Sequence, residues 1–184
     1  MSDQAPLVMD AEEHQVTSET PAKERVVIAR LAEHSEWLPM LARWLEREWP
    51  DWYGPHGPGE ATADLEEAAQ SDGLPLAVIA LLDGVPCGIS VLRPTDAAAA
   101  QTGHAPWVGG GLVRADLRGQ GIGARLLAAM ESEARRLGFG TIYCSTTGAE
   151  RLLERCGWQS IGTITHDGAP LAVYRKPVSI EDGA

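Results

Sequence analysis

The sequence predicts an α+β fold in three layers, with a mixed, mostly antiparallel sheet of about six or seven strands and about four helices. Two observations carry this prediction. Apolar segments with strand-like and helix-like spacing follow one another in the order β-α-α-β-β-β-α-β-α-β-β. The dipeptide Asp83-Gly84 also stands between two apolar runs, which is a strong signal for a β-hairpin.

The amino-terminal half contains two predicted helices after one strand. Apolar residues recur at helical spacing up to Trp49-Pro50, and a segment punctuated by Gly and Pro follows them. The predicted elements are a strand over 25–31, a helix over 35–49 with Ser35 as its N-cap, a loop over 51–58, and a helix over 62–70 capped by Thr62.

The carboxy-terminal half contains most of the predicted sheet and a long amphipathic helix. That helix starts at Ile122, has one apolar face, and is ended by Gly138. The other predicted elements are strands over 76–82 and 85–92, a loop over 96–104, a strand over 106–113 interrupted by Gly109-Gly110-Gly111, a strand over 141–145, a helix over 149–156, and a hairpin of 158–165 with 171–175 around Asp167-Gly168.

The chain of 184 residues is long enough for one domain with a substantial core. We expect this domain to span residues 25–177. Residues 1–24 are polar and lack periodicity, and the stretch from Asp10 to Glu24 holds five acidic residues. This composition predicts a disordered acidic tail, and residues 178–184 are expected to form a flexible carboxy-terminal tail.

Charge and composition exclude several classes of function. The formal net charge of −11 argues against nucleic acid or an anionic membrane as a partner and favours a cationic or amine-bearing one. No apolar run is long enough to cross a bilayer, and the amino terminus lacks a signal-peptide profile, so a cytoplasmic protein is expected. The three cysteines have no metal-binding spacing, and we expect no metal site.

The segment Arg118–Gly123, called here the glycine loop, is the most informative part of the sequence. It lies between a predicted strand and the long helix. The first turn of a helix presents unpaired backbone N–H groups and the positive end of the helix dipole, which together bind phosphate. Glycines let phosphate oxygens approach these groups, and Arg118 adds a cation. The pattern therefore predicts a phosphate-binding site.

Three ligand classes use such a loop. A P-loop requires Gly-Lys-Ser/Thr, which this segment lacks. A dinucleotide fingerprint, G-x-G-x-x-G/A, is matched by Gly119–Ala124, but it should directly follow its strand and have an acid at the end of the next strand. Here the loop trails its strand, and Thr141–Ser145 contains no acid. The third class binds acyl-CoA through the pattern Arg/Gln-x-x-Gly-x-Gly/Ala. Arg118, Gly121 and Gly123 match this pattern, so acyl-CoA agrees best with the sequence.

The segment Pro106–Leu127 resembles the central motif of the GNAT superfamily of N-acetyltransferases, and Glu150–Trp158 resembles the family's segment near the carboxy terminus. The resemblance implies a sheet that splays open between the fourth and fifth strands, with acetyl-CoA as co-substrate in the gap. Gly109 to Gly111 in the fourth strand fit a bulge that opens it, because glycine often marks bulges. It also implies transfer of the acetyl group to an amine by direct attack in a ternary complex. The residues that it assigns to acetyl-CoA are Leu112, Val113, Arg118, Gly119, Gln120, Gly121, Ile122, Gly123 and Ala124.

The same resemblance leaves the catalytic acid and base unassigned. In many relatives an aromatic-tyrosine pair stands at the positions of Leu152 and Leu153, and its tyrosine, at the position of Leu153, protonates the leaving thiolate. Neither leucine can donate a proton. The remaining weak candidates for the catalytic groups are Tyr143, Ser145 and His104, with Thr147, His56 and a water relay as alternatives. The thiolate can also leave unaided, because its pKa is near 8.5.

The acceptor pocket of the family is shaped by the first two helices and the loop between them. In this sequence that region contains Trp49, Trp52 and Tyr53, which together could hold an amine by cation–π contact. We expect a small-molecule or peptide amine as the partner, and a homodimer stays open. The alternative function is a non-catalytic, regulatory protein that keeps the fold and binds acyl-CoA.

Overall fold

A computed structural model, which describes residues 25–166 and 168–178, contains one seven-stranded sheet with the strand order β1-β2-β3-β4-β5-β7-β6. Only β4 and β5 pair in parallel, and the other neighbours are antiparallel. This confirms the predicted mixed, mostly antiparallel sheet. The strands are β1 Val26–Arg30, β2 Leu76–Leu82, β3 Val85–Arg93, β4 Trp107–Val113, β5 Thr141–Thr146, β6 Gln159–His166 and β7 Ala169–Pro177.

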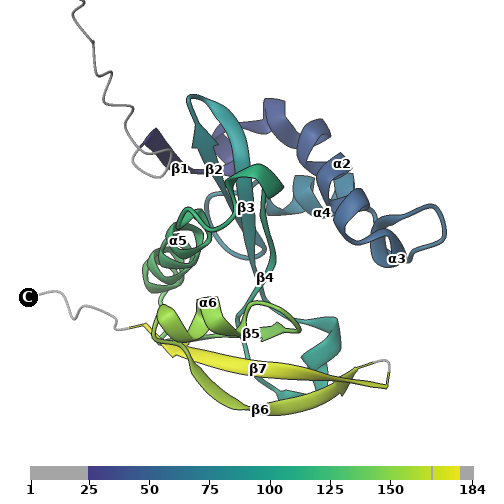
Figure 1. Ribbon diagram of the computed structural model, residues 1–184, viewed down its shortest axis with the longest axis vertical. Helices are drawn as coiled ribbons and strands as arrows, with labels where there is room; N and C mark the ends of the chain where they lie inside the picture. Colours follow the sequence, from purple (N-terminus) through teal and green to yellow (C-terminus); the bar gives the residue numbers. More distant parts are fainter. Residues whose placement is uncertain (1–24, 167, 179–184) are drawn as a thin grey trace, which may run out of the picture.

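Helices cover both faces of the sheet. The helices α2 and α4 pack on one face, while α5 and α6 lie on the other (Figure 1). The α-helices are α2 Leu38–Glu48, α3 Pro50–Tyr53, α4 Ala61–Ala68, α5 Ile122–Arg136 and α6 Glu150–Arg155; the 3-10 helices are η1 Leu31–Glu33, η2 Ser35–Trp37, η3 Ala97–Thr102 and η4 Ala115–Leu117.

Three local predictions need correction. Ser35 begins the 3-10 turn η2 rather than capping α2, whose N-cap position is taken by Trp37 without a side-chain hydrogen bond. Thr62 lies inside α4, because that helix begins at Ala61. The predicted loop over 51–58 begins with the helical turn α3, since Pro50 at the first helical position has a backbone angle suited to a helix start.

The predicted small-residue loop over 96–104 also contains regular structure. The Asp96 side chain accepts a hydrogen bond from the Ala98 N–H at 2.9 Å and so caps the 3-10 helix η3. At the other boundary of the domain, Val178 is 2% exposed and its N–H donates to the Gly140 carbonyl at 2.9 Å. Val178, which was predicted to begin the tail over 178–184, is therefore part of the packed domain. The rest of that tail and the predicted tail over 1–24 lie outside the described residues.

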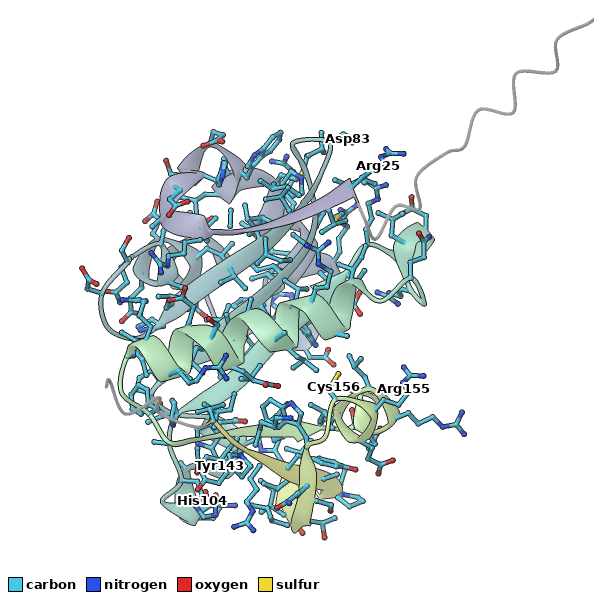
Figure 2. All side chains as sticks on the ribbon, turned by 90° about the vertical axis from the view of Figure 1, so that its left-hand side faces the viewer. Arg25, Asp83, His104, Tyr143, Arg155 and Cys156 are labelled. Carbon is cyan, nitrogen blue, oxygen red and sulfur yellow. The ribbon has the colours of Figure 1, made fainter. Side chains whose placement is uncertain are left out.

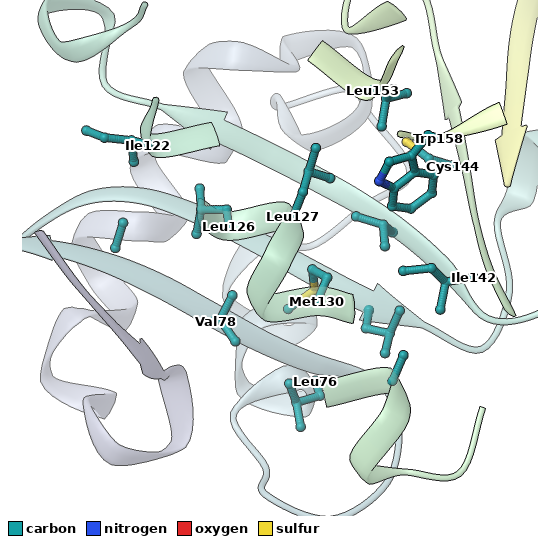
Figure 3. Close-up of a cluster of buried hydrophobic side chains, with 14 of the residues drawn as sticks. Leu76, Val78, Ile122, Leu126, Leu127, Met130, Ile142, Cys144, Leu153 and Trp158 are labelled. Carbon is teal, nitrogen blue, oxygen red and sulfur yellow. The ribbon is translucent and has the colours of Figure 1, made fainter. Parts of the chain in front are cut away.

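The core has two layers, one on each side of the sheet. Figure 3 shows the layer under α5, in which Met130 and Leu126 pack against Val78 and Ile142 of the sheet. The second layer joins α2 and α4 to the opposite sheet face, where Ile89 is fully buried. Because successive side chains of a strand point to opposite faces, each of the central strands contributes to both layers.

The sheet opens between its fourth and fifth strands, as the family resemblance implies. β4 runs to Val113, but its ladder with β5 consists of two pairs, Trp107 with Tyr143 and Val108 with Cys144. We call the end of this ladder, at Val108 and Cys144, the branch point. Beyond it, β4 continues beside β3 alone.

A bulge in β4 lies next to the branch point. The β3–β4 register moves from Val91 opposite Gly109 to Ile89 opposite Leu112, so two β4 residues face one residue of β3. Gly110 has φ +59°, a conformation that residues with a Cβ atom rarely adopt. The run of glycines at 109–111 thus supplies the bulge that was predicted from the sequence.

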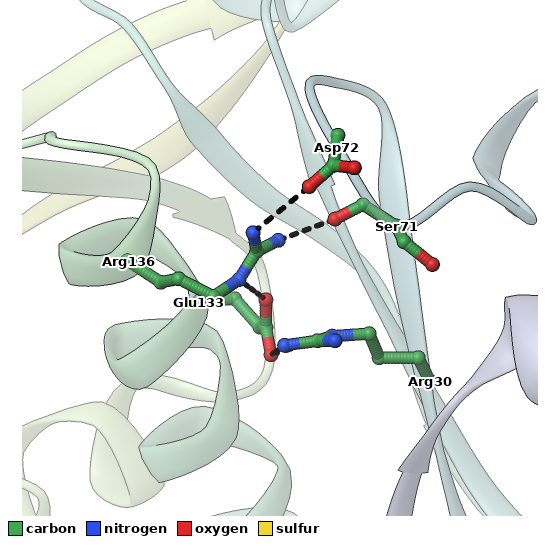
Figure 4. Close-up of polar contacts among 5 residues, drawn as sticks. All are labelled: Arg30, Ser71, Asp72, Glu133 and Arg136. Carbon is green, nitrogen blue, oxygen red and sulfur yellow. Dashed lines mark hydrogen bonds and ion pairs between the residues drawn. The ribbon is translucent and has the colours of Figure 1, made fainter.

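A polar network connects α5 to β1 and to the segment that precedes β2. Glu133 accepts hydrogen bonds from Arg30 of β1 at 3.0 Å and from Arg136 at 2.7 Å, and Arg136 continues to Asp72 and the Ser71 carbonyl (Figure 4). The Glu133 side chain is only 13% exposed. The bond to its carboxylate raises the pKa of Arg30.

Replacement of Glu133 by Gln should lower the free energy of unfolding by about 1–2 kcal/mol, because two arginines would face each other without the charge between them. The melting temperature should fall by about 3–6 °C for a domain of this size. Thermal unfolding followed by circular dichroism measures the change. The matched control is Asp83→Asn, which removes the carboxylate of the exposed Arg25–Asp83 pair and should cost less than about 0.5 kcal/mol. Equal losses in both variants would contradict this role of Glu133.

Candidate functional site

A cavity of about 490 Å³ occupies the opening in the sheet. It extends from the start of α5, at Gly123, to the region of α3. The residues that line it are Trp49, Trp52, Tyr53, Ser90, Arg93, Thr95, Asp96, Ala97, Ala98, Trp107, Val108, Gly109, Gly110, Gly111, Leu112, Val113, Gly123, Leu126, Leu127, Cys144, Ser145, Thr146, Thr147, Ala149, Leu152, Leu153, His166 and Leu171.

The glycine loop leads directly into α5 at one end of this cavity. Gly121 has φ +83° and occupies the N-cap position, so the chain enters the helix through a left-handed residue. The N–H of Arg125 donates to the Gly121 carbonyl at 3.3 Å. The N–H groups of the preceding first turn, Ile122 to Ala124, therefore lie at the open positive end of a 15-residue helix.

Arg118 brings a cation to the same end. Its Nε donates to the Val113 carbonyl at 2.9 Å, and its guanidinium reaches Glu48 of α2 at 3.5 Å. Arg114, which precedes the glycine loop, is paired with Asp116 at 2.7 Å, and this contact lowers the pKa of the Asp116 carboxyl. Backbone dipole and guanidinium together make this end suited to an anionic group.

Trp49, Trp52 and Tyr53, called here the aromatic wall, line the other end of the cavity. Trp52 is 42% exposed, and its ring meets that of Tyr53 edge-on with 6.5 Å between centroids. The Tyr53 hydroxyl donates to Asp64 at 2.8 Å and accepts from Arg93 at 3.2 Å. Burial is the main cause that raises the pKa of Tyr53, so the phenol stays protonated at neutral pH. The wall is thus held in place by polar contacts behind it.

Of the three weak catalytic candidates, only Ser145 lines the cavity. Tyr143 and His104 stack on each other with 4.3 Å between ring centroids, and Figure 2 shows the two labelled side chains together. Trp107 lies beside both rings and donates from Nε1 to the His104 carbonyl at 2.7 Å. These aromatic groups form a packed cluster next to the cavity.

Ser145 has a partner that the sequence reasoning missed. Its hydroxyl donates to the carboxylate of Asp96, which also lines the cavity. Arg93 and Asp64, which fix Tyr53, were missed as well. The one local signal was Asp96 before a run of small residues, a typical capping position; the contact to Ser145 joins residues far apart in the sequence.

The positions of the expected tyrosine carry apolar side chains in contact with the cavity. Leu152 and Leu153 of α6 both line it, and Leu153 is 1% exposed. On this side the cavity wall is completed by Leu126 and Leu127 of α5. Neither leucine of α6 can donate a proton to a leaving group.

Cys144 also lines the cavity, at the branch point, but its chemistry is that of a buried thiol. Burial raises the pKa of Cys144 to about 12, and the nearby Asp96 carboxylate adds to this effect. A thiol with this pKa is protonated at neutral pH, whereas the thiolate is the reactive nucleophile. Cys144 is therefore unsuited to carry an acyl group during catalysis.

The comparisons with known proteins identify the family. The model of the acetyltransferase (GNAT) family matches residues 38–158. The chain belongs to this family: it is an acetyltransferase, and acetyl-CoA is its co-substrate. A search of the curated proteins finds no significant match.

Solved structures share the fold at low sequence identity. An aminoglycoside 6'-N-acetyltransferase complexed with coenzyme A has a TM-score of 0.67 and 16% identity, over 83% of this chain and 97% of that one. The aminoglycoside 6'-N-acetyltransferase from Enterococcus faecium has a TM-score of 0.66 and 17% identity, over 83% and 97%. An acetyltransferase of the GNAT family from Streptococcus pneumoniae has a TM-score of 0.63 and 17% identity, over 84% and 99%.

Two further findings concern the described residues, 25–166 and 168–178. None of their helices is long and apolar enough to cross a membrane. Within the same ranges, no group of three or more His, Cys, Asp or Glu side chains is arranged to hold a metal ion.

Cys144 should react slowly with alkylating reagents. At pH 8, a pKa of about 12 leaves about 10³-fold less thiolate than an ordinary cysteine has, and burial slows access further. Labelling by iodoacetamide, followed by peptide mass spectrometry, should give a rate at Cys144 at least about 10³-fold below that in the same chain unfolded in guanidinium. An acetyl adduct on Cys144 after incubation with acetyl-CoA would contradict this assignment.

Proposed function

We propose that this protein transfers the acetyl group of acetyl-CoA to a primary amine of a cationic small molecule or a peptide, by direct attack in a ternary complex. One observation carries the proposal: a single cavity in the opened sheet connects the start of α5 with the aromatic wall. Two substrates that enter from these two ends would meet at the branch point.

The donor end of the proposal consists of the glycine loop and the open edge of β4. The pyrophosphate of acetyl-CoA would accept hydrogen bonds from the N–H groups of residues 119–124, with Arg118 beside them. Leu112 and Val113, which line the cavity, would present backbone groups to the pantetheine amides. The positive end of α5 supports this placement, because CoA is strongly anionic and the protein as a whole is acidic.

The acceptor end of the proposal is the aromatic wall. Indole and phenol faces attract a cation, and the net charge of −11 favours an amine that carries positive charge. Similar folds include two aminoglycoside 6'-N-acetyltransferases, and this supports an amine-bearing acceptor for the present chain.

The proposed reaction forms one carbon–nitrogen bond and breaks one carbon–sulfur bond. The amine nitrogen attacks the thioester carbonyl, the carbon–sulfur bond breaks, and the sulfur leaves as a thiolate. Of the two protons that the ammonium group loses, one ends on the thiolate and the other goes to solvent. Because a thiolate with a pKa near 8.5 is a good leaving group, the apolar side chains of Leu152 and Leu153 are compatible with turnover.

A second candidate function is that of a non-catalytic, regulatory protein that binds acyl-CoA. The absence of a proton donor at Leu152 and Leu153 is the observation that favours it. Both candidates require CoA binding, so the binding site and the turnover are tested separately.

For the donor site, Arg118→Ala should weaken acetyl-CoA binding about 10-fold, the loss expected for one charge-assisted contact. Gly121→Asp should weaken it about 100-fold, because the introduced carboxylate would cap the first turn of α5 and repel phosphate. Isothermal titration calorimetry measures both. Arg135→Ala, at the opposite end of α5, is the control and should bind normally. Unchanged affinity in the first two variants would refute this placement of the pyrophosphate.

For turnover, the wild-type protein should release CoA thiol from acetyl-CoA in the presence of at least one amine in a panel of aminoglycosides, polyamines and peptides with free amino termini. Thiol release is followed with a disulfide reagent, and the acetylated product by mass spectrometry. Tight CoA binding without turnover on any amine would refute the proposed enzyme and support the regulatory alternative.

A further inference from the structure

Asp96 is the one acidic residue among those that line the cavity. It lies in the connection between β3 and η3, and its side chain is directed to Ser145 of β5. Ser145 is the first β5 residue after the branch point, because the last pair of the β4–β5 ladder is Val108 with Cys144. The carboxylate therefore lies where the two strands separate.

Strand alternation places this carboxylate on the face of the sheet that carries the aromatic wall. Cys144 and Val108 belong to the core layer under α5, so their strand neighbours Ser145 and Trp107 face the opposite side. Arg93, which pairs with Trp107 in the β3–β4 ladder, faces that side too and contacts Tyr53 of the wall. An acceptor held at the wall would thus approach the branch point from the side of Asp96.

Two hydrogen bonds fix the orientation of the carboxylate. One oxygen accepts from the Ala98 N–H at 2.9 Å, and the other accepts from the Ser145 hydroxyl. Capping of η3 explains the first bond but not the second, which turns an oxygen toward the cavity side of β5. A carboxylate oxygen has more than one acceptor position, so the oxygen bound to Ser145 retains capacity for a second donor.

The other polar groups that line the cavity are less suited than Asp96 to bind an ammonium group and accept its proton. The guanidinium of Arg93 is a cation and contacts Asp64 and Tyr53. The Tyr53 phenol is protonated at neutral pH and already donates to Asp64. His166 is exposed and lies at the end of β6, which is separated from β5 by β7 in the sheet.

We propose that Asp96 binds the ammonium group of the acceptor at the branch point and takes the proton that the nitrogen must lose before attack, with Ser145 as the residue that positions the carboxylate. This inference rests on the proposed N-acetyltransferase function. The proton passes from nitrogen to the carboxylate and on to solvent, and the nitrogen lone pair then forms the bond to the thioester carbon. The carbon–sulfur electron pair leaves with the thiolate of CoA, and the second proton lost by the nitrogen ends on this thiolate.

The test compares two acceptors in the same variants. The first is a primary alkylamine that the wild-type protein acetylates, and the second is a hydrazide of matched size, which is unprotonated at neutral pH and needs no ammonium-binding group. Asp96→Asn keeps the shape of the side chain and removes its charge. It should lower kcat/KM for the alkylamine about 100-fold, the lower end of the effect of a positioned proton-transfer group, and lower it less than about 3-fold for the hydrazide.

Two further variants make the result specific. Ser145→Ala should lower kcat/KM for the alkylamine about 10-fold with the same selectivity, because the carboxylate would lose one of its two restraints. Asp83→Asn, an equal charge change at the exposed β2–β3 turn, should leave both acceptors unaffected. The affinity for acetyl-CoA, measured by calorimetry, should be unchanged in all three.

The outcomes separate this inference from the proposed function. Alkylamine turnover within about 3-fold of wild type in Asp96→Asn would overturn the role of Asp96 and leave the acetyltransferase proposal standing. Equal losses for both acceptors, together with a lower melting temperature, would also overturn it and assign Asp96 only to capping η3. A wild-type protein that binds acetyl-CoA but acetylates neither acceptor would refute both proposals.

Discussion

The β4–β5 ladder ends early, and this early end leaves the space in which the cavity lies. A parallel pair normally continues for the full length of its strands, because unpaired backbone groups inside a protein are costly. Here pairing stops after Val108 and Cys144, although β4 extends to Val113. The β4 edge beyond the branch point faces the cavity, and in the proposed complex the amide groups of pantetheine would pair with it as a neighbouring strand does.

The bulge at Gly110 is the local cause of this opening. It bends β4 and shifts the β3–β4 register by one residue, while the two strands stay paired on both sides of the bulge. The core layer under α5 continues across both halves of the sheet, because it contains Leu126 of α5 and Val78 of β2 as well as Leu153 of α6 and Tyr174 of β7. The cavity is consequently a property of backbone geometry, and the side chains along it determine what each end can bind.

The two ends of the cavity differ in charge in the way that acetyl-CoA and the proposed cationic acceptor would require. The donor end combines the positive pole of a 15-residue helix with Arg118, within a protein of net charge −11. The distant negative charges are screened over about 8 Å in physiological salt, so a local cationic site can bind an anion on an acidic protein. At the branch point the cavity meets a carboxylate and, further on, the aromatic wall, which suit a cation.

Local sequence signals predicted much of the fold, because helices, hairpins and glycine loops depend on nearby residues. The hairpin at Asp83-Gly84, the helix from Ile122 and the bulge at Gly109–Gly111 are of this kind. The family resemblance added the opened sheet. Local sequence signals could not predict the contacts at the acceptor end. Asp96 contacts Ser145, and Arg93 contacts Tyr53, only because tertiary packing brings these residues together. Side chains joined across 49 and 40 positions leave no periodic pattern.

The structure also gives a physical meaning to the leucines that stand where many relatives have a catalytic tyrosine. The sequence predicts the loss of a catalytic acid at Leu152 and Leu153, and the structure places both leucines in the cavity wall on the donor side. The demand for proton transfer is unequal at the two ends of the proposed reaction. A thiolate leaves readily without an acid near neutral pH, whereas an alkylammonium cannot attack until it loses a proton. In the proposed mechanism the apolar wall lies beside the leaving group and the Asp96 carboxylate lies beside the nucleophile. The one acidic side chain that lines the cavity therefore serves the step that depends more on proton transfer.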